Sequence, residues 1–306
     1  MPERAERQTR LLSRYVVDLS AAKIPSEALR ASSTSKLTSS ELNPSTQEYF
    51  LRSQREILQT AKRAKERADP QQKQTAIVFG AGPGGDIPLK ALATMFDALT
   101  LVDIRADKTV KTIALLPPNL QQKITIVEAD VTGVVASTLN SMQWNKRQTS
   151  TDASFINKMT QELPTIEVKN KAPDLGKHTF VCSSLVASQL YDLPYAYMQK
   201  LNETKHHYPF TYRTNVSTTV RELQREHLRY LARSTAESGL IHFADTYAAH
   251  EQTPTGEKNF PMIEPGVNSV LNTIFNREER PSSNWQYSDT RRYTIRSFVL
   301  DPHRSK

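Results

Sequence analysis

The sequence predicts an α/β protein with a doubly wound, mostly parallel sheet of seven strands and an antiparallel hairpin at its C-terminal end. From residue 75 onward, apolar runs of strand length alternate with helical patterns. This alternation indicates a parallel sheet with both faces covered by helices. A glycine-rich loop follows the first apolar run directly. Near the C-terminus, only a short turn separates two aromatic-containing runs, which is typical of an antiparallel pair.

The expected elements follow from these patterns in chain order. We expect helices over 87–96, 108–116 and 217–238, and strands over 75–79, 99–103, 124–128, 179–183, 239–244, 285–287 and 293–300. A polar stretch over 143–177 precedes the fourth strand and is longer than a crossover requires. We therefore expect an insertion outside the sheet at 143–177.

Residues 1–70 are expected to form a helical N-terminal extension, and residues 71–306 the α/β domain. The extension has helical patterns over 7–19 and 45–68, joined by a polar loop. The second helix should end at Asp69-Pro70, because the residue before a proline avoids the helical region.

Composition narrows the class of protein. The net charge is +8, but no run of five basic residues occurs, so a solvated surface explains the charge more simply than a nucleic-acid site. No run approaches the 18 or so apolar residues of a spanning helix, which argues against an integral membrane protein. Cys182 is the only cysteine, so an intramolecular disulfide or a multi-cysteine metal site is excluded. We expect Cys182 to be buried in its strand, a cytoplasmic location and no metal.

The glycine-rich loop Gly80-Ala-Gly-Pro-Gly-Gly-Asp86 lies between the first strand and the first helix. Glycine reaches positive φ and lets a ligand approach the backbone closely, and amides at a helix start favour anionic or polar ligands. Asp103 ends the second strand, where a carboxylate accepts hydrogen bonds from the ribose hydroxyls of an adenosine-containing ligand. The alternative is a tight turn beside a solvated aspartate.

Two further carboxylates fall at the carboxyl ends of strands, where open α/β sheets bind ligands. Asp130 follows the third strand and could accept the exocyclic amine of an adenine while Val131 packs on the ring, or it could cap a helix. Asp245 ends the fifth strand, with acceptor contact and helix capping as open alternatives. His242 alternates to the other face and is expected to pack against a covering helix.

The segments Phe79–Asp86, 101–103 and 128–130 resemble the first three motifs of the class I, Rossmann-like S-adenosylmethionine-dependent methyltransferases. The resemblance implies six parallel strands with a seventh antiparallel, S-adenosylmethionine as cofactor and a helical N-terminal lid. Its implied cofactor contacts are Gly80, Gly82 and Gly84 of the loop, Asp103 at the ribose and Asp130 at the adenine. Further candidate cofactor contacts beside them are Ala81, Gly85, Ile104, Val131 and Ser183. The family usually has an acidic residue two positions before the first glycine, where this chain has Val78. Asp86 is an alternative source of that carboxylate, or a helix N-terminal residue.

The chemistry of the acceptor is less defined by the sequence. Methyl transfer draws much of its acceleration from proximity and orientation, and no catalytic residue is identified. The loop after the fourth strand offers Ser183 and Ser184, as ligand contacts or ordinary strand-end hydrogen bonds. Tyr191 and Tyr195 are candidate acceptor contacts, or helix core residues. We expect a small-molecule acceptor, with RNA or protein as the runner-up.

Two other functions remain open from the sequence. A nicotinamide-dependent oxidoreductase also has glycines at 80, 82 and 85 and an acid near position 103. However, neither Tyr191 nor Tyr195 is followed by a lysine four residues later. The second alternative is a catalytically silent module that keeps the S-adenosylmethionine site.

Overall fold

The computed structural model describes residues 44–82, 85–103, 106–129, 131, 173–188, 190, 210–254, 256–263, 265–288 and 291–302. The helices are α3 (Pro44–Arg67), α4 (Leu89–Met95), α5 (Ala106–Ile113), α6 (Pro118–Gln121), α10 (Phe210–Arg233) and α11 (Pro265–Ile274). The strands are β1 (Thr75–Phe79), β2 (Ala98–Asp103), β3 (Ile124–Glu128), β4 (His178–Ser184), β5 (Thr235–Thr253), β6 (Gly256–Pro261), β7 (Asn276–Glu279), β8 (Ser283–Ser288) and β9 (Arg291–Asp301).

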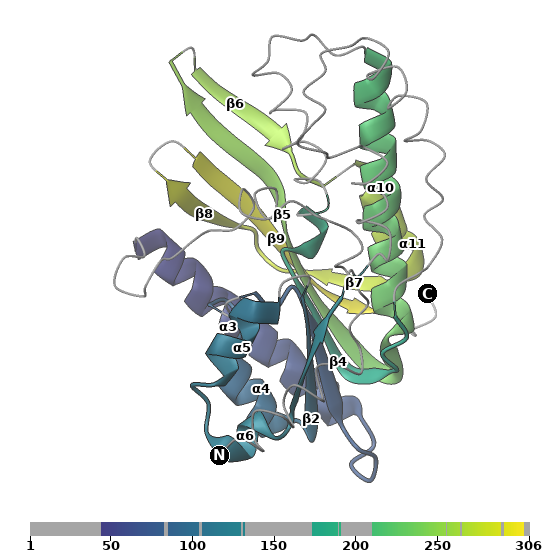
Figure 1. The fold of residues 1–306 in the computed structure, drawn as a ribbon. Helices are drawn as coiled ribbons and strands as arrows, with labels where there is room; N and C mark the ends of the chain where they lie inside the picture. The colour runs from purple at the N-terminus through teal and green to yellow at the C-terminus, as the bar shows by residue number, and fades with distance from the viewer. Residues whose placement is uncertain are drawn as a thin grey trace, which may run out of the picture.

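All nine strands belong to one sheet, with the main order β3-β2-β1-β4-β5-β9-β7 (Figure 1). The pairs β3–β2, β2–β1, β1–β4 and β4–β5 are parallel, whereas β9 is antiparallel to both β5 and β7. Strand β7 therefore runs parallel to β5, and the main path has six parallel strands and one antiparallel strand. The predicted α/β class, the mostly parallel sheet and the antiparallel β8–β9 hairpin are confirmed.

The C-terminal edge differs in detail from the expectation. We placed the hairpin at the edge, but β9 lies inside the sheet and the edge strand is β7. The sequence of β7, Asn-Arg-Glu-Glu, has no apolar residue, so it carries no strand pattern. It pairs along only one side and is mostly exposed, which lets polar residues occupy it.

Helices cover both faces of the sheet, as expected. One apolar layer joins β1, β4 and β5 to α10 and α11 through residues such as Phe79, Leu231 and Leu271. The other joins the opposite face of the same strands to α3 and α4 through Ile57, Leu92 and others. Figure 1 shows α10 and α11 on one side of the sheet and α3, α4 and α5 on the other. The central strand β1, Thr-Ala-Ile-Val-Phe, is mostly β-branched or aromatic and is buried on both faces from Ala76 onward, as expected for a parallel strand between two helix layers.

A four-stranded antiparallel extension continues past the carboxyl ends of the parallel strands. β5 does not end at Ala244 as expected but runs to Thr253, where it pairs with β6 on one side and β9 on the other. β8 completes the order β6-β5-β9-β8. Figure 1 shows these two hairpins projecting beyond the parallel part of the sheet. The extension therefore stands beside the edge where ligands bind in open α/β sheets.

The helices expected over 87–96 and 108–116 correspond to α4 and α5, but the helix expected over 217–238 ends too late. α10 ends at Arg233, and residues 235–238 belong to β5 because they pair in the sheet beside β4. α3 corresponds to the helix expected over 45–68 and ends at Arg67, two residues before Asp69. The helix expected over 7–19 and the 143–172 part of the expected insertion lie outside the described residues, and residues 173–177 form neither helix nor strand. Each helix within the described part of the chain is too short or too polar to cross a membrane.

Candidate functional site

The glycine-rich loop is held by the ends of β1 and β2. Gly80 and Gly82 have φ of 74° and 45°, so the positive φ expected of these glycines is present. The Gly80 amide donates to the Val102 carbonyl oxygen at 2.9 Å, and the Gly82 amide donates to Asp103 Oδ2 at 2.8 Å. The loop therefore turns tightly at the carboxyl edge of the sheet and is bound directly to the aspartate predicted as a ligand contact.

The lack of a Cβ at Gly80 also serves packing within the protein. A Cβ there would lie 2.5 Å from the Ser184 carbonyl oxygen and 2.6 Å from Val186 Cγ2. A Cβ at Gly82 would meet only the Gly80 carbonyl oxygen, at 3.9 Å. Gly80 is thus required by the close approach of the β4 end, whereas the space beside Gly82 is open.

Asp103 lies at the junction of the loop, β2 and β3. Its side chain is partly exposed, and its backbone carbonyl accepts a hydrogen bond from the Ala129 amide at 3.1 Å. Thr109 Oγ1 of α5 donates to the Gly82 carbonyl oxygen at 2.9 Å and closes the loop from the other side. A partly exposed carboxylate at this edge, next to donors of a positive-φ loop, fits an adenosine ribose.

Asp86 follows the loop and bonds across to the end of β4. Ser184 Oγ donates to Asp86 Oδ2 at 2.5 Å, and burial raises the pKa of the Asp86 carboxyl. α4 begins after Pro88 without a side-chain cap. Asp86 therefore does not cap the N-terminus of α4, the alternative role that the sequence allowed.

The end of β4 combines a buried hydrogen bond with an unusual backbone conformation. A 2.8 Å hydrogen bond joins Ser183 Oγ to His227 Nε2 of α10, and both side chains are fully buried. The Ser183 hydroxyl is therefore used in a hydrogen bond inside the protein at the end of β4, the second of the two roles expected for it. Leu185, two residues on, has φ of 56°, a conformation that costs a non-glycine residue about 1–2 kcal/mol. Such strain gathers at binding sites.

Asp245 is fully buried and caps the turn that follows β4. Its oxygens accept hydrogen bonds from the amides of Ala187 at 2.7 Å, Ser188 at 3.0 Å and Thr246 at 2.8 Å. Loss of solvent outweighs these bonds and raises the pKa of the carboxyl to about 6. The structure gives Asp245 the capping role, the second of its two predicted roles.

The remaining predicted residues are either packed inside the protein or lie outside the described part of the chain. Ala81 and Val131 are buried, Val131 within the core layer of α10, and Gly85 packs against Phe50 of α3. Cys182 is a buried free thiol, as expected. His242 is buried against α3, also as expected, with Nδ1 3.4 Å from Thr60 Oγ1. Outside the described residues lie Gly84, Ile104, Asp130, Tyr191 and Tyr195.

An aromatic cluster joins the start of α3 to the β8–β9 hairpin. Tyr49 stacks on Trp285, with ring centroids 5.1 Å apart and planes 10° apart, and Trp285 packs on Tyr293 at 5.6 Å. Trp285 Nε1 also donates to Thr46 Oγ1 at 2.9 Å. Tyr49 and Trp285 are 236 positions apart, so the sequence gives no sign that their rings meet.

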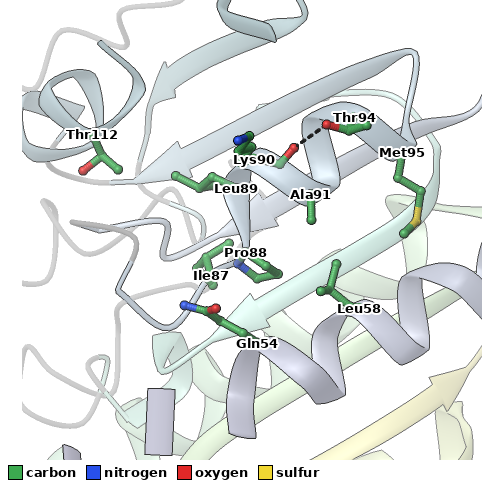
Figure 2. Close-up of a pocket in the computed structure, with 10 residues that line it drawn as sticks. All are labelled: Gln54, Leu58, Ile87, Pro88, Leu89, Lys90, Ala91, Thr94, Met95 and Thr112. Atoms are coloured by element: carbon green, nitrogen blue, oxygen red, sulfur yellow. Dashed lines mark hydrogen bonds between the residues drawn. The ribbon is translucent and has the colours of Figure 1, made fainter. Parts of the chain in front are cut away.

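A separate surface groove of about 820 Å³ runs between α3 and α4. Figure 2 shows Gln54 and Leu58 of α3 on one side, residues 87–91, Thr94 and Met95 on the other, and Thr112 of α5 beyond them. None of the predicted ligand residues lines this groove. The groove adjoins the C-terminal end of the loop, because Gln54 in its lining donates to the Gly85 carbonyl oxygen, but its described lining includes neither Asp103 nor the end of β4.

Comparison with known proteins gives only distant matches. No family model and no curated protein matches the sequence. Among solved structures, the chain is similar to the N-methyltransferase NodS from Bradyrhizobium japonicum WM9 at 10% identity, covering 82% of this chain and 96% of that one with a TM-score of 0.40. It is also similar to magnesium protoporphyrin IX methyltransferase (ChlM) from Synechocystis PCC 6803 with bound SAH, at 9% identity. That match covers 90% of this chain and 92% of ChlM, with a TM-score of 0.43. DhpI, in its complex with SAH, matches at 12% identity, 85% and 98% coverage and a TM-score of 0.32. Similarity this low assigns no role to any residue, so the functional inference rests on the strand order and the loop geometry.

Proposed function

We propose that the protein is an S-adenosylmethionine-dependent methyltransferase. The observation that carries the proposal is the position of β9, antiparallel between β5 and β7 in an otherwise parallel main path. This is the sheet implied by the resemblance of the three sequence motifs. The glycine loop and Asp103 lie together at the carboxyl edge of that sheet, where its ligand would bind. Fold alone does not establish function. Methyl transfer is supported by this strand order together with the glycine loop and Asp103 at the carboxyl edge.

The chemical groups of the described residues suit S-adenosylmethionine. Asp103 would accept hydrogen bonds from the ribose hydroxyls, and the loop around Gly82 would bring backbone amides close to the ligand. When bound, S-adenosylmethionine supplies an activated methyl group on a positively charged sulfur. The chain's task is then to orient the acceptor in line with that group and to exclude water, for which no charged catalyst is required.

The strand order also weighs against a nicotinamide-dependent oxidoreductase. Dinucleotide-binding sheets have the order 3-2-1-4-5-6 with parallel strands. Here an antiparallel strand occupies the sixth place. The glycine spacing, which fits both classes, is therefore better assigned to a methyltransferase.

We further propose a small-molecule acceptor and a reducing, cytoplasmic setting. The contact between α3 and the β8–β9 hairpin narrows the approach to the carboxyl edge on one side, which suits a small acceptor better than a folded RNA or protein. The buried free thiol of Cys182 is compatible with the cytoplasm.

Calorimetric titration tests the cofactor. We expect the wild-type chain to bind S-adenosylmethionine and S-adenosylhomocysteine but not NAD. Asp103→Ala should weaken S-adenosylhomocysteine binding by about 2–3 kcal/mol, roughly thirty- to more than a hundredfold, because hydrogen bonds to a charged group contribute about 1.5–3 kcal/mol each.

Asp103→Asn is the matched control, since it keeps an oxygen for the Gly82 amide but removes the charge. We expect Asp103→Asn to retain most of the thermal stability and still lose affinity. If both variants keep full affinity but melt at much lower temperature, Asp103 only anchors the loop. Binding of NAD alone would overturn the methyltransferase proposal. Methyl transfer from labelled cofactor to metabolite, RNA and protein panels would then identify the acceptor class, or reveal a silent binding module.

A further inference from the structure

A buried polar cluster lies between the first half of α3 and the glycine loop. Its members are the hydroxyls of Tyr49 and Ser53 on α3, the carboxylate of Asp86 and the hydroxyl of Ser184 at the end of β4. Tyr49 is 4% exposed and Ser53 is 5% exposed. The two α3 residues are one helical turn apart, so they face the same side of the helix.

Contacts of α3 with the loop fix the location of this cluster. Gln54 Nε2 donates to the Gly85 carbonyl oxygen at 2.8 Å. The Phe50 ring packs so closely on Gly85 that a Cβ there would lie 2.7 Å from its Cε2 atom. Asp86 is the next residue and is bonded to Ser184. The cluster therefore adjoins the C-terminal end of the glycine loop, where the loop meets the end of β4.

Two donors in this cluster have no acceptor within the described part of the chain. Tyr49 Oη and Ser53 Oγ lie near each other, and the Ser53 hydroxyl lowers the pKa of Tyr49 slightly, but neither hydroxyl meets full hydrogen-bond geometry with any described group. A buried donor left without a partner costs about 1–3 kcal/mol, and native proteins rarely keep one without a reason. Burial raises the pKa of Tyr49 well above its usual value, and the charges of Asp86 and Asp245 raise it further, so its hydroxyl stays protonated and able to donate.

The carboxylate of Asp86 has no positively charged partner among the described residues. Asp86 is only partly exposed, its donors among the described residues are the neutral hydroxyl of Ser184 and its own backbone amide, and no described ion pair includes it. A buried carboxylate is costly unless a cation or several donors approach it. The cluster therefore offers an acceptor that lacks a cation and two donors that lack an acceptor.

We propose that this cluster binds the α-amino-acid end of the cofactor, its ammonium on Asp86 and its carboxylate on the hydroxyls of Tyr49 and Ser53. A zwitterion is the group that satisfies both signs at once. The assignment rests on the proposed function. It also gives a physical account of Val78, which stands where the resembling family has an acid: in this chain the carboxylate comes from the other end of the loop, and helix α3 supplies the donors.

The experiment compares each variant with wild type, ligand by ligand, for three ligands that share the adenosine and differ at the amino-acid end, so the different charge on sulfur cancels within each comparison. Calorimetry would use S-adenosylhomocysteine, decarboxylated S-adenosylmethionine, which lacks the carboxylate, and 5′-deoxy-5′-methylthioadenosine, which lacks the whole amino-acid end. Asp86→Asn should weaken S-adenosylhomocysteine binding about ten- to a hundredfold and leave methylthioadenosine within a factor of three. Tyr49→Phe should weaken S-adenosylhomocysteine about five- to tenfold and leave decarboxylated S-adenosylmethionine unchanged.

The stability of the free protein separates a binding role from a structural one. Because Tyr49→Phe removes a buried donor that has no partner, the ligand-free variant should melt at the same or a higher temperature than wild type while it binds less tightly. Tyr230→Phe is the matched control, since its hydroxyl donates to the Pro173 carbonyl oxygen at 2.6 Å; it should lose stability and keep affinity. Asp69→Asn, on the exposed turn after α3, controls for the loss of charge.

Equal losses for S-adenosylhomocysteine and methylthioadenosine in Asp86→Asn, or no loss in either variant, would overturn this assignment. The proposed function would survive that result, because wild type would still bind all adenosine ligands. If wild type binds none of the three ligands, the proposed function itself fails and the assignment falls with it.

Discussion

At the scale of single residues, two glycines of one loop are required for different reasons. Both have positive φ, which costs an L-residue about 1–2 kcal/mol. Gly80 also lies against the Ser184 carbonyl of β4, whereas the position of a Cβ at Gly82 is open. A glycine motif in a sequence therefore combines positions fixed by packing with positions fixed by the turn or by a ligand.

We predict that Gly80→Ala lowers the free energy of unfolding by about 2–5 kcal/mol, the sum of the φ cost and the overpacking. Gly82→Ala should cost only about 1–2 kcal/mol. Urea denaturation followed by circular dichroism measures both values. Equal losses in the two variants would contradict the close contact between the loop and β4.

At the scale of secondary-structure elements, the two halves of α3 have different interfaces. The second half buries Ile57, Ala61 and Ala64 in the core, and Arg67 pairs with Asp301 at 2.8 Å. The first half is held by aromatic stacking on the β8–β9 hairpin and by polar contacts with the glycine loop. The first half should therefore open at a lower free energy than the second, which is the behaviour expected of a lid.

We predict that Trp285→Ala raises amide hydrogen exchange in residues 46–54 of α3, because it removes the stack with Tyr49 and the hydrogen bond to Thr46. Residues 57–67 should keep their protection. Leu51→Ala is the matched control on the same helix, since Leu51 is 59% exposed and should change little. Uniform loss of protection along α3 would show that the helix opens as one unit.

At the scale of the whole molecule, buried titratable groups shift the response of stability to acid, and three of them have large pKa shifts. Burial lowers the pKa of His227 to about 3 and that of His242 to about 4, whereas it raises that of Asp245 to about 6. Below pH 6.5 these two histidines become protonated in the unfolded chain but stay neutral in the folded one. The free energy of unfolding therefore falls as the pH is lowered. Asp245 acts in the opposite direction, because its folded carboxyl takes up a proton before the unfolded one does.

We predict that these three groups together lower the free energy of unfolding by about 2.5 kcal/mol between pH 7 and pH 5. Each histidine contributes a loss of about 2 kcal/mol and Asp245 a gain of about 1.4 kcal/mol. Denaturation at the two pH values tests this in two variants that should move apart: His227→Gln should reduce the fall, and Asp245→Asn should enlarge it. A fall that is the same in both variants would contradict the assignment to these groups.

The sequence by itself determined the parallel half of the sheet and the core of the site. β1 and β4 are buried between two helix layers, and β2 and β3 beside them are partly buried, so each strand contains a run of apolar or β-branched residues that is readable without a structure. The glycine loop and Asp103 were also predictable, because each lies next to the end of such a strand and parallel ends meet at one edge. These features depend on neighbours in the chain or on the common direction of the strands.

Only the tertiary structure decided the features that depend on contacts between distant segments. β7 is polar because it is an exposed edge strand, so nothing in its composition marks it. The continuation of β5 to Thr253 depends on its pairing with β6 and β9 rather than on apolar residues. Likewise, the capping role of Asp245 and the buried hydroxyl of Tyr49 follow from the positions of the β4 turn and of α3. A side chain's partner across the molecule is set by packing, and a single sequence carries no local pattern for it.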